Sequence, residues 1–155
     1  NKFKDKELEM RYQNHEEENI LFTRAALAMV ENIDYNVGRI LNAMERLQLE
    51  EETIVIYLSD NGPNGWRWNG GMRGRKGSTD DGGVKTPFFI QWKKHIKPGL
   101  KVEALGGAID VTPTLISLLG IDNPLKNIDG NNHTNHQLHR IGLNRKTIDK
   151  KSCGA

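Results

Sequence analysis

The residues best suited to chemistry lie between Ile54 and Gly83, where a short apolar run ends at Asp60 and Asn61. An adjacent carboxylate and carboxamide offer hard oxygen donors, which suit calcium or magnesium better than zinc. Asp-Asn-Gly is also ordinary turn chemistry. Because the pair follows a strand-like run and precedes a glycine-rich loop with cations, the sequence favours a metal site. Two ligands leave a calcium shell of about six to eight oxygens incomplete, so other ligands must come from elsewhere.

The loop after this pair carries Lys76 among closely spaced glycines, beside Arg73 and Arg75. Glycines let the backbone approach a ligand, and a lysine there supplies a compact positive charge for an oxyanion. The alternative is a solvated loop lysine. Nucleotide binding is disfavoured because no Walker or GxGxxG spacing fits and no helix is expected directly after the loop. Arg73 is expected to orient the loop by pairing with a carboxylate.

Hydrophobic periodicity predicts the elements that position these residues. Apolar residues recur every three or four positions from Phe22 to Leu47, which predicts a long surface helix covering a sheet. The nearly continuous apolar run before Asp60 predicts a strand buried on both faces, as in parallel sheets. Thr112 and Pro113 predict the start of a short helix. The expected elements are a helix over 19–49, strands over 53–59, 87–92 and 104–109, and a helix over 112–120.

This order of elements predicts an α/β fold, and the motifs resemble the C-terminal part of the catalytic domain in the sulfatase family. These enzymes use a formylglycine nucleophile and a calcium ion. The resemblance extends from about Phe3 to Ile121. It rests on Asp-Asn-Gly at 60–62, Arg-Lys-Gly-Ser at 75–78 and Asp-Gly-Gly-Val at 81–84. It implies part of an alkaline-phosphatase-like sandwich with a mostly parallel sheet covered by helices.

The resemblance also implies residue roles. Asp60 and Asn61 correspond to calcium ligands, and Lys76 to a catalytic residue that contacts the sulfate group. In the family, a hydrated formylglycine attacks the sulfate sulfur while calcium holds the nucleophile and the sulfate oxygens. Lys76 would offset negative charge on the transferring group. The expected substrate is an aryl or carbohydrate sulfate ester.

Other loop residues are expected to support this site. Trp66, Trp68 and Asn69 are candidates for lining the substrate entrance, although ordinary packing is an equal alternative for them. Asp81 stands where the family has glutamate, and we expect it to fix the loop that holds Lys76. Asp110 is interpreted as a capping or loop-bracing acid.

Parts of the family pattern are absent from the sequence. No Cys-x-Pro-x-Arg or Ser-x-Pro-x-Arg segment, the source of formylglycine, occurs in it, and Cys153 lacks that context. The family's early aspartate pair and leaving-group histidine are also absent. We therefore expect 1–122 to be the C-terminal portion of a catalytic domain and 123–155 an irregular tail or truncated subdomain. The partner would be the missing N-terminal half, without which the chain should be inactive.

Composition excludes several classes of function. A net charge of +2 with scattered cations argues against nucleic acid, and no apolar stretch is long enough for a membrane span. No signal peptide is visible, although the resemblance implies a periplasmic or secreted protein. His133, His136 and His139 lack an acidic or cysteine partner at a matching interval, which disfavours a metal site there.

Two rival functions remain open at this point. An alkaline-phosphatase-like phosphatase or phosphodiesterase would usually hold two transition metals with histidine ligands, and no histidine lies near Asp60. A non-catalytic module that binds sulfated glycans would use the same loop without turnover. An upstream Cys-x-Pro-x-Arg segment would favour the enzyme.

Overall fold

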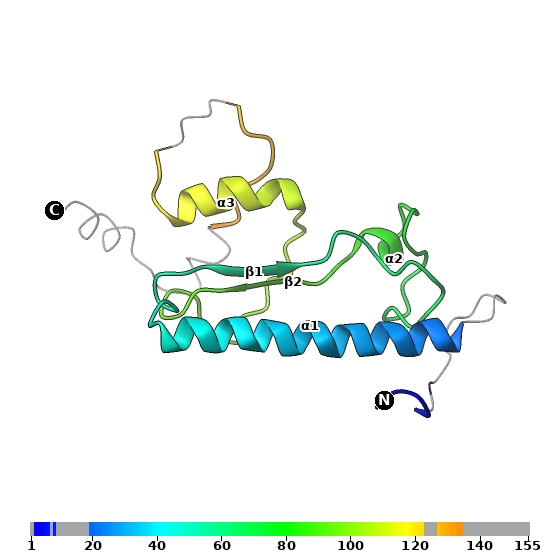
Figure 1. Cartoon of the computed structure of the whole chain (residues 1–155). Helices are drawn as coiled ribbons and strands as arrows, with labels where there is room; N and C mark the ends of the chain where they lie inside the picture. Colours follow the sequence, from blue (N-terminus) through cyan, green and yellow to red (C-terminus); the bar gives the residue numbers. More distant parts are fainter. Residues whose placement is uncertain (1, 7, 9–18, 123–126, 135–155) are drawn as a thin grey trace. The chain divides into compact units, whose positions relative to one another are not determined.

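The computed structural model describes residues 2–6, 8, 19–122 and 127–134. The chain divides into two compact units, Asn1–Gln91 and Trp92–Ala155. The first contains α1 (Ile20–Arg46), β1 (Val55–Leu58), α2 (Asp81–Val84) and β2 (Phe88–Gln91), and the second contains the 3₁₀ turn η1 (Ala108–Asp110) and α3 (Val111–Leu118) (Figure 1). Within the described residues, no helix has the length and apolar character needed to cross a membrane.

The long helix predicted from periodicity is α1. The side chain of Asn19 caps its first turn by accepting a hydrogen bond from the Phe22 amide at 3.1 Å. The helix ends at Arg46, three residues before the expected end at 49, and Gln48 then takes a left-handed φ of 57°. No residue of α1 is buried, and Leu21 and Phe22 are 76% and 71% exposed. The apolar stripe predicted to face a core is therefore largely open to solvent.

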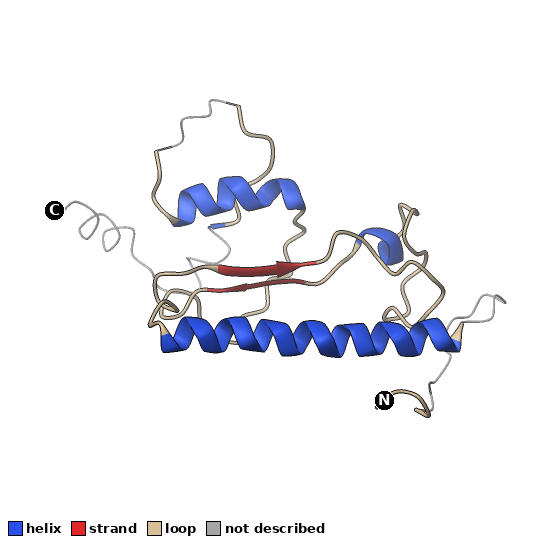
Figure 2. Ribbon diagram, in the orientation of Figure 1, coloured by secondary structure: helices blue, strands red, loops and turns tan. Residues whose placement is uncertain are grey.

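The expected strands over 53–59 and 87–92 form β1 and β2, but they pair antiparallel, with Val55 opposite Gln91 and Leu58 opposite Phe88. The expectation of a mostly parallel sheet is wrong for these residues, since the described strands form one two-stranded antiparallel sheet (Figure 2). A parallel pair needs a crossover connection, whereas this long loop returns the chain beside its starting point. The expectation that the first strand is buried on both faces is also wrong, because its residues are half-buried or exposed.

In the second unit, the strand expected over 104–109 does not form. Residues 104–107 have no regular structure, and the 3₁₀ turn η1 follows them. The Asp110 side chain accepts a hydrogen bond from the Gly107 amide at 2.7 Å, and such local bonding competes with a strand ladder. The expected helix is α3, which begins at Val111, one residue before Thr112.

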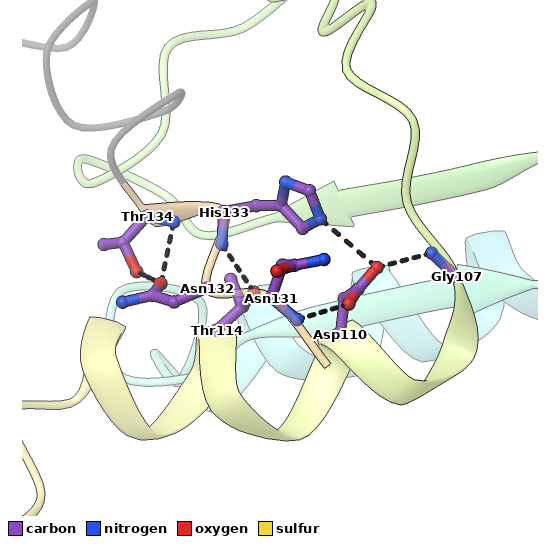
Figure 3. Close-up of polar contacts among 7 residues, drawn as sticks. All are labelled: Gly107, Asp110, Thr114, Asn131, Asn132, His133 and Thr134. Atoms are coloured by element: carbon purple, nitrogen blue, oxygen red, sulfur yellow. Dashed lines mark hydrogen bonds and ion pairs between the residues drawn. The ribbon is translucent and has the colours of Figure 1, made fainter. Parts of the chain in front are cut away.

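Asp110 also binds a segment distant in sequence (Figure 3). Its carboxylate accepts a hydrogen bond from the Asn131 amide at 2.6 Å and lies 3.2 Å from His133 Nε2. The His133 amide in turn donates to Thr114 Oγ1 at 3.1 Å. We call Gly107, Asp110, Asn131 and His133 the Asp110 clasp. It confirms the predicted bracing role of Asp110.

The remaining expectations for the C-terminal region are not tested. The boundary expected between residues 122 and 123 stays a prediction. His136, His139 and Cys153 lie outside the described residues.

Candidate functional site

The site begins at the turn that follows β1. Asp60 is exposed, and its Oδ1 accepts a hydrogen bond from the Asn61 amide at 2.9 Å. The side-chain nitrogen of Asn61 donates to the Gly62 carbonyl at 2.8 Å. That bond uses the amide nitrogen and not the side-chain oxygen, which is the atom that can bind a cation. The turn thus holds a carboxylate and a carboxamide side by side at the end of the strand.

Main-chain hydrogen bonds tie the glycine-rich loop to this turn. The Lys76 amide donates to the Pro63 carbonyl at 2.9 Å, and the Gly62 amide donates to the Gly83 carbonyl at 2.9 Å. Within the loop, the Gly82 amide donates to the Arg73 carbonyl at 2.7 Å. Residues far apart in sequence are therefore brought together, and the backbone of Lys76 is fixed close to the Asp60–Asn61 turn.

Close approach of backbones explains the glycines of this loop. A Cβ on Gly62 would stand 1.8 Å from the Gly82 carbonyl oxygen, and one on Gly82 would stand 2.3 Å from the Gly74 oxygen. A Cβ on Gly83 would meet the Ser78 carbonyl oxygen at 2.2 Å. No side chain fits at such distances without movement of the backbone. The Gly-Gly pair is thus required by the packing of the loop against the turn.

Lys76 lies at the tip of a β-turn. The Ser78 amide donates to the Arg75 carbonyl at 2.9 Å, which closes the turn, and Gly77 has a φ of 89°. A positive φ at the third position is typical of a type II turn and favours glycine there. Lys76 occupies the second position and is exposed, so its ammonium group is available to a ligand.

A hollow of about 480 Å³ lies beside this turn. It is lined by Trp66, Arg73, Gly74, Arg75, Lys76, Gly77, Ser78 and Asp80. The lining carries three cations and one carboxylate. Arg73 Nε lies 3.6 Å from Asp80 Oδ1, which confirms that Arg73 pairs with a carboxylate. The hollow retains a net positive charge, as an anion site requires.

Two tryptophans and an asparagine were predicted at the substrate entrance. Trp66 is half-buried and lines the hollow, whereas Trp68 is 52% exposed and is not part of the lining. The side-chain nitrogen of Asn69 donates to the Met72 and Gly74 carbonyls at 3.0 and 3.2 Å. Asn69 therefore braces the loop from within, and whether it also meets substrate stays a prediction.

The carboxylate expected to fix the loop was Asp81. In the structure it opens α2, a single helical turn that was not expected after the loop, and its side chain is exposed. The contacts that hold Lys76 are main-chain bonds, and the acid that pairs with Arg73 is the neighbouring Asp80.

Sequence reasoning missed the placement of Arg75. Its guanidinium carbon lies 4.5 Å from the centroid of the Trp66 ring, which is the geometry of a cation–π contact. The two residues are separated by the sharp turns of the loop, so no local periodicity could pair them. An arginine and a tryptophan in one loop was the available signal.

The donor set at the turn suits a hard cation. Asp60 and Asn61 carry side-chain oxygens, the donor type that calcium prefers. Among the residues that the structure describes, no cluster of three or more histidine, cysteine, aspartate or glutamate side chains could hold a metal. The turn therefore offers two oxygen donors, and any further metal ligands would have to be of other types or come from elsewhere.

Comparison with known proteins decides the family. The family model described as Sulfatase matches residues 3–121. The chain belongs to the sulfatase family. Membership implies a metal cofactor and a formylglycine in the complete enzyme.

Individual sulfatases match more than half of the chain. Arylsulfatase A of Homo sapiens is 40% identical over 103 residues, which cover 63% of this chain and 20% of that protein. Steryl-sulfatase of Mus musculus is 38% identical over 105 residues, 61% of this chain and 17% of that protein. The chain therefore spans about a fifth of the length of these relatives.

A solved structure also aligns with most of this chain. The crystal structure of Ps i-CgsB in complex with k-i-k-neocarrahexaose aligns with a TM-score of 0.65 and 29% identity. The alignment covers 71% of this chain and 25% of that chain.

Proposed function

We propose that this chain is the C-terminal part of a sulfatase catalytic domain, in which Lys76 contacts the sulfate group and Asp60 and Asn61 bind calcium. The main observation in support is the hydrogen bond from the Lys76 amide to the Pro63 carbonyl at 2.9 Å. It joins the cationic turn to the turn that carries two oxygen donors. A sulfate ester between them would meet a positive charge on one side and a metal on the other.

The chain's own contribution is orientation and charge. Lys76 projects from a turn whose shape is set by Gly77 and closed by Ser78, so its backbone is positioned before the substrate arrives. Its ammonium group would stabilise the negative charge on the transferring sulfuryl group. When bound, calcium would supply Lewis-acid polarisation of the sulfate oxygens.

The complete enzyme would also include the N-terminal half of the domain, with the formylglycine. There, β1 and β2 would join a larger sheet of an alkaline-phosphatase-like sandwich, which would cover the exposed face of α1. The relatives are named as aryl and steryl sulfatases, and the structural neighbour holds a neocarrahexaose. Aryl or carbohydrate sulfate esters are the proposed substrates, and a periplasmic or secreted location is proposed with them.

A sulfated-glycan-binding module is the second candidate. It is supported by the net positive charge of the hollow's lining, which a sulfate-binding site needs as much as an active site does. The cationic hollow would then bind sulfate without turnover. A two-metal phosphatase has less support, because no histidine accompanies Asp60 in the turn.

The test uses the intact protein that contains this chain and compares Lys76→Ala with Lys85→Ala. Lys85 is also an exposed lysine but does not line the hollow. On an aryl sulfate, Lys76→Ala should lower kcat roughly a hundredfold, the typical loss for a transition-state charge contact, and Lys85→Ala should not. If the two variants have equal activities, within about twofold, Lys76 is only a surface lysine and does not contact the sulfate. A preference for aryl phosphate would favour the phosphatase.

A further inference from the structure

We propose that Arg75, held against Trp66, forms a second anion contact beside Lys76. The site would then select sulfate esters that carry another anionic group near the sulfate that is removed. This inference rests on the proposed function of the hollow, and it adds the substrate class.

Arg75 is held in place by contacts on both its side chain and its backbone. Its guanidinium carbon lies 4.5 Å from the centroid of the Trp66 ring. Its amide donates to Ser78 Oγ at 3.3 Å and its carbonyl accepts from the Ser78 amide at 2.9 Å. A side chain fixed in this way loses less conformational entropy when it binds a ligand.

Stacking on Trp66 does not consume the hydrogen-bonding capacity of the guanidinium. A cation–π contact is an electrostatic attraction to the ring face and takes up none of the hydrogen-bond acceptors that the five N–H donors can use. Arg75 can therefore remain on the ring and still bind an oxyanion with two parallel hydrogen bonds. Sulfate and carboxylate groups both present that pair of oxygens.

The charge around the hollow agrees with two anionic groups. The Arg73 charge faces Asp80 at 3.6 Å, which leaves Arg75 and Lys76 as the cations not opposed by another carboxylate of the lining. A sulfate monoester carries one negative charge, so it offsets only one of these. A hollow of about 480 Å³ also falls in the range of sites for whole small ligands. A sugar with a second sulfate or a carboxylate next to the first sulfate matches both features.

The competing explanation is that Arg75 only packs against Trp66 and stabilises the loop. In that case its loss would affect every substrate alike. A role in substrate choice instead changes the ratio of activities on singly and doubly charged substrates. Those two explanations are separated by measuring both substrates on the same variants.

The experiment measures kcat/KM of the intact sulfatase on a hexosamine monosulfate and on the disulfate of the same sugar. Arg75→Gln should lower kcat/KM for the disulfate roughly tenfold, as expected for one lost charge-assisted hydrogen-bonded contact. The same variant should lower kcat/KM for the monosulfate by less than about twofold. Arg75→Lys keeps the charge but not the planar guanidinium. Its kcat/KM for the disulfate should lie between those of wild type and Arg75→Gln. Arg67→Gln serves as the control, since Arg67 lies in the same loop but does not line the hollow.

The outcomes separate this inference from the proposed function. An equal loss on both sugars with Arg75→Gln, or a similar selective loss with Arg67→Gln, would overturn it. If wild-type protein hydrolyses neither sugar nor an aryl sulfate, the proposed function fails. Calorimetric affinities for the same two sugars then decide the inference. Tighter binding of the disulfate than of the monosulfate, lost in Arg75→Gln, would support the inference. Equal affinity of the wild-type protein for the two sugars would overturn the inference.

Discussion

At the scale of single residues, Asp60 and Asn61 place a carboxylate and a carboxamide in one turn at the strand end. Asp60 is exposed at the strand end, and the side-chain nitrogen of Asn61 is bonded to the backbone, so both side chains are held next to each other. The adjacent donor types could be read from sequence because they are neighbours in the chain. The contact between Arg75 and the Trp66 ring could not be read from sequence, since it depends on how the loop folds back.

The first prediction concerns this pair of ligands. Asp60→Ala in the intact sulfatase should weaken calcium binding at least tenfold, because a charged oxygen ligand is removed from the shell. Calcium titration by calorimetry, with metal-stripped protein, measures the affinity. Asp34→Ala, which removes an exposed acid from α1, is the control. Calcium affinity unchanged by Asp60→Ala would exclude Asp60 as a ligand.

At the scale of elements, the loop and the turn form one unit because glycines let their backbones meet. Sequence identified the glycine-rich loop and the presence of the long helix, since both follow from local composition and periodicity. It did not predict the antiparallel pairing of β1 and β2, because strand direction depends on where the connecting loop returns. It also misassigned residues 104–109, where the Asp110 side chain competes for the Gly107 amide.

The second prediction tests the contact of loop and turn. Gly82→Ala should destabilise the intact enzyme and lower its activity, since the added Cβ would stand 2.3 Å from the Gly74 oxygen. Gly38→Ala should be neutral or slightly stabilising, because nothing lies within 4 Å of the added Cβ and alanine favours a helix. Thermal unfolding and aryl sulfate turnover measure both effects. Equal behaviour of the two variants would contradict the packing described for Gly82.

The third prediction concerns the Asp110 clasp. Hydrogen bonds from the Asn131 and Gly107 amides, with a smaller effect of His133, hold the pKa of Asp110 below its ordinary value, despite opposition from burial. A lowered folded-state pKa means that the carboxylate stabilises the fold above its unfolded pKa of about 3.9. That stabilisation is lost as the pH falls through the folded-state pKa.

Hydrogen exchange can follow this loss locally. Protection of the amides of 107 and 131 should be constant from neutral pH to about pH 5 and should decrease below about pH 4. In Asp110→Asn, one of the two acceptor oxygens becomes an amide nitrogen that cannot accept a hydrogen bond, so at least one of the two amides should already have low protection at neutral pH. Asp122→Asn, an exposed acid, is the control. Strong protection in Asp110→Asn at neutral pH would show that the carboxylate does not hold these segments.

At the scale of the whole molecule, the described residues leave several large apolar side chains open to solvent. Leu21, Phe22, Met29 and Leu47 of the α1 region are each more than 60% exposed, and Phe89 of β2 is 64% exposed. Such apolar surface is typical of faces that are covered in a complete protein. The sequence could predict that these positions are apolar but not what covers them.

The fourth prediction follows from the missing nucleophile. The purified chain alone should not hydrolyse an aryl sulfate, with or without calcium, because no Cys-x-Pro-x-Arg or Ser-x-Pro-x-Arg segment is present. Turnover assays with the intact sulfatase as positive control provide the measurement. Calcium-dependent turnover that Asp60→Ala abolishes would mean that the chain carries its own nucleophile.

The antiparallel pairing of β1 and β2 has a consequence for exchange between proteins. The Ser59 amide donates to the Pro87 carbonyl at 3.3 Å, so the segment that carries the site leaves and re-enters the fold at adjacent positions. Residues 60–86 therefore form one continuous segment whose two ends lie next to each other, and we call this segment the cassette. Recombination between relatives, or grafting in the laboratory, can replace this cassette while the strand register on either side is kept. Under the proposed function, substrate preference would then move with residues 60–86 and not with the strands that support them.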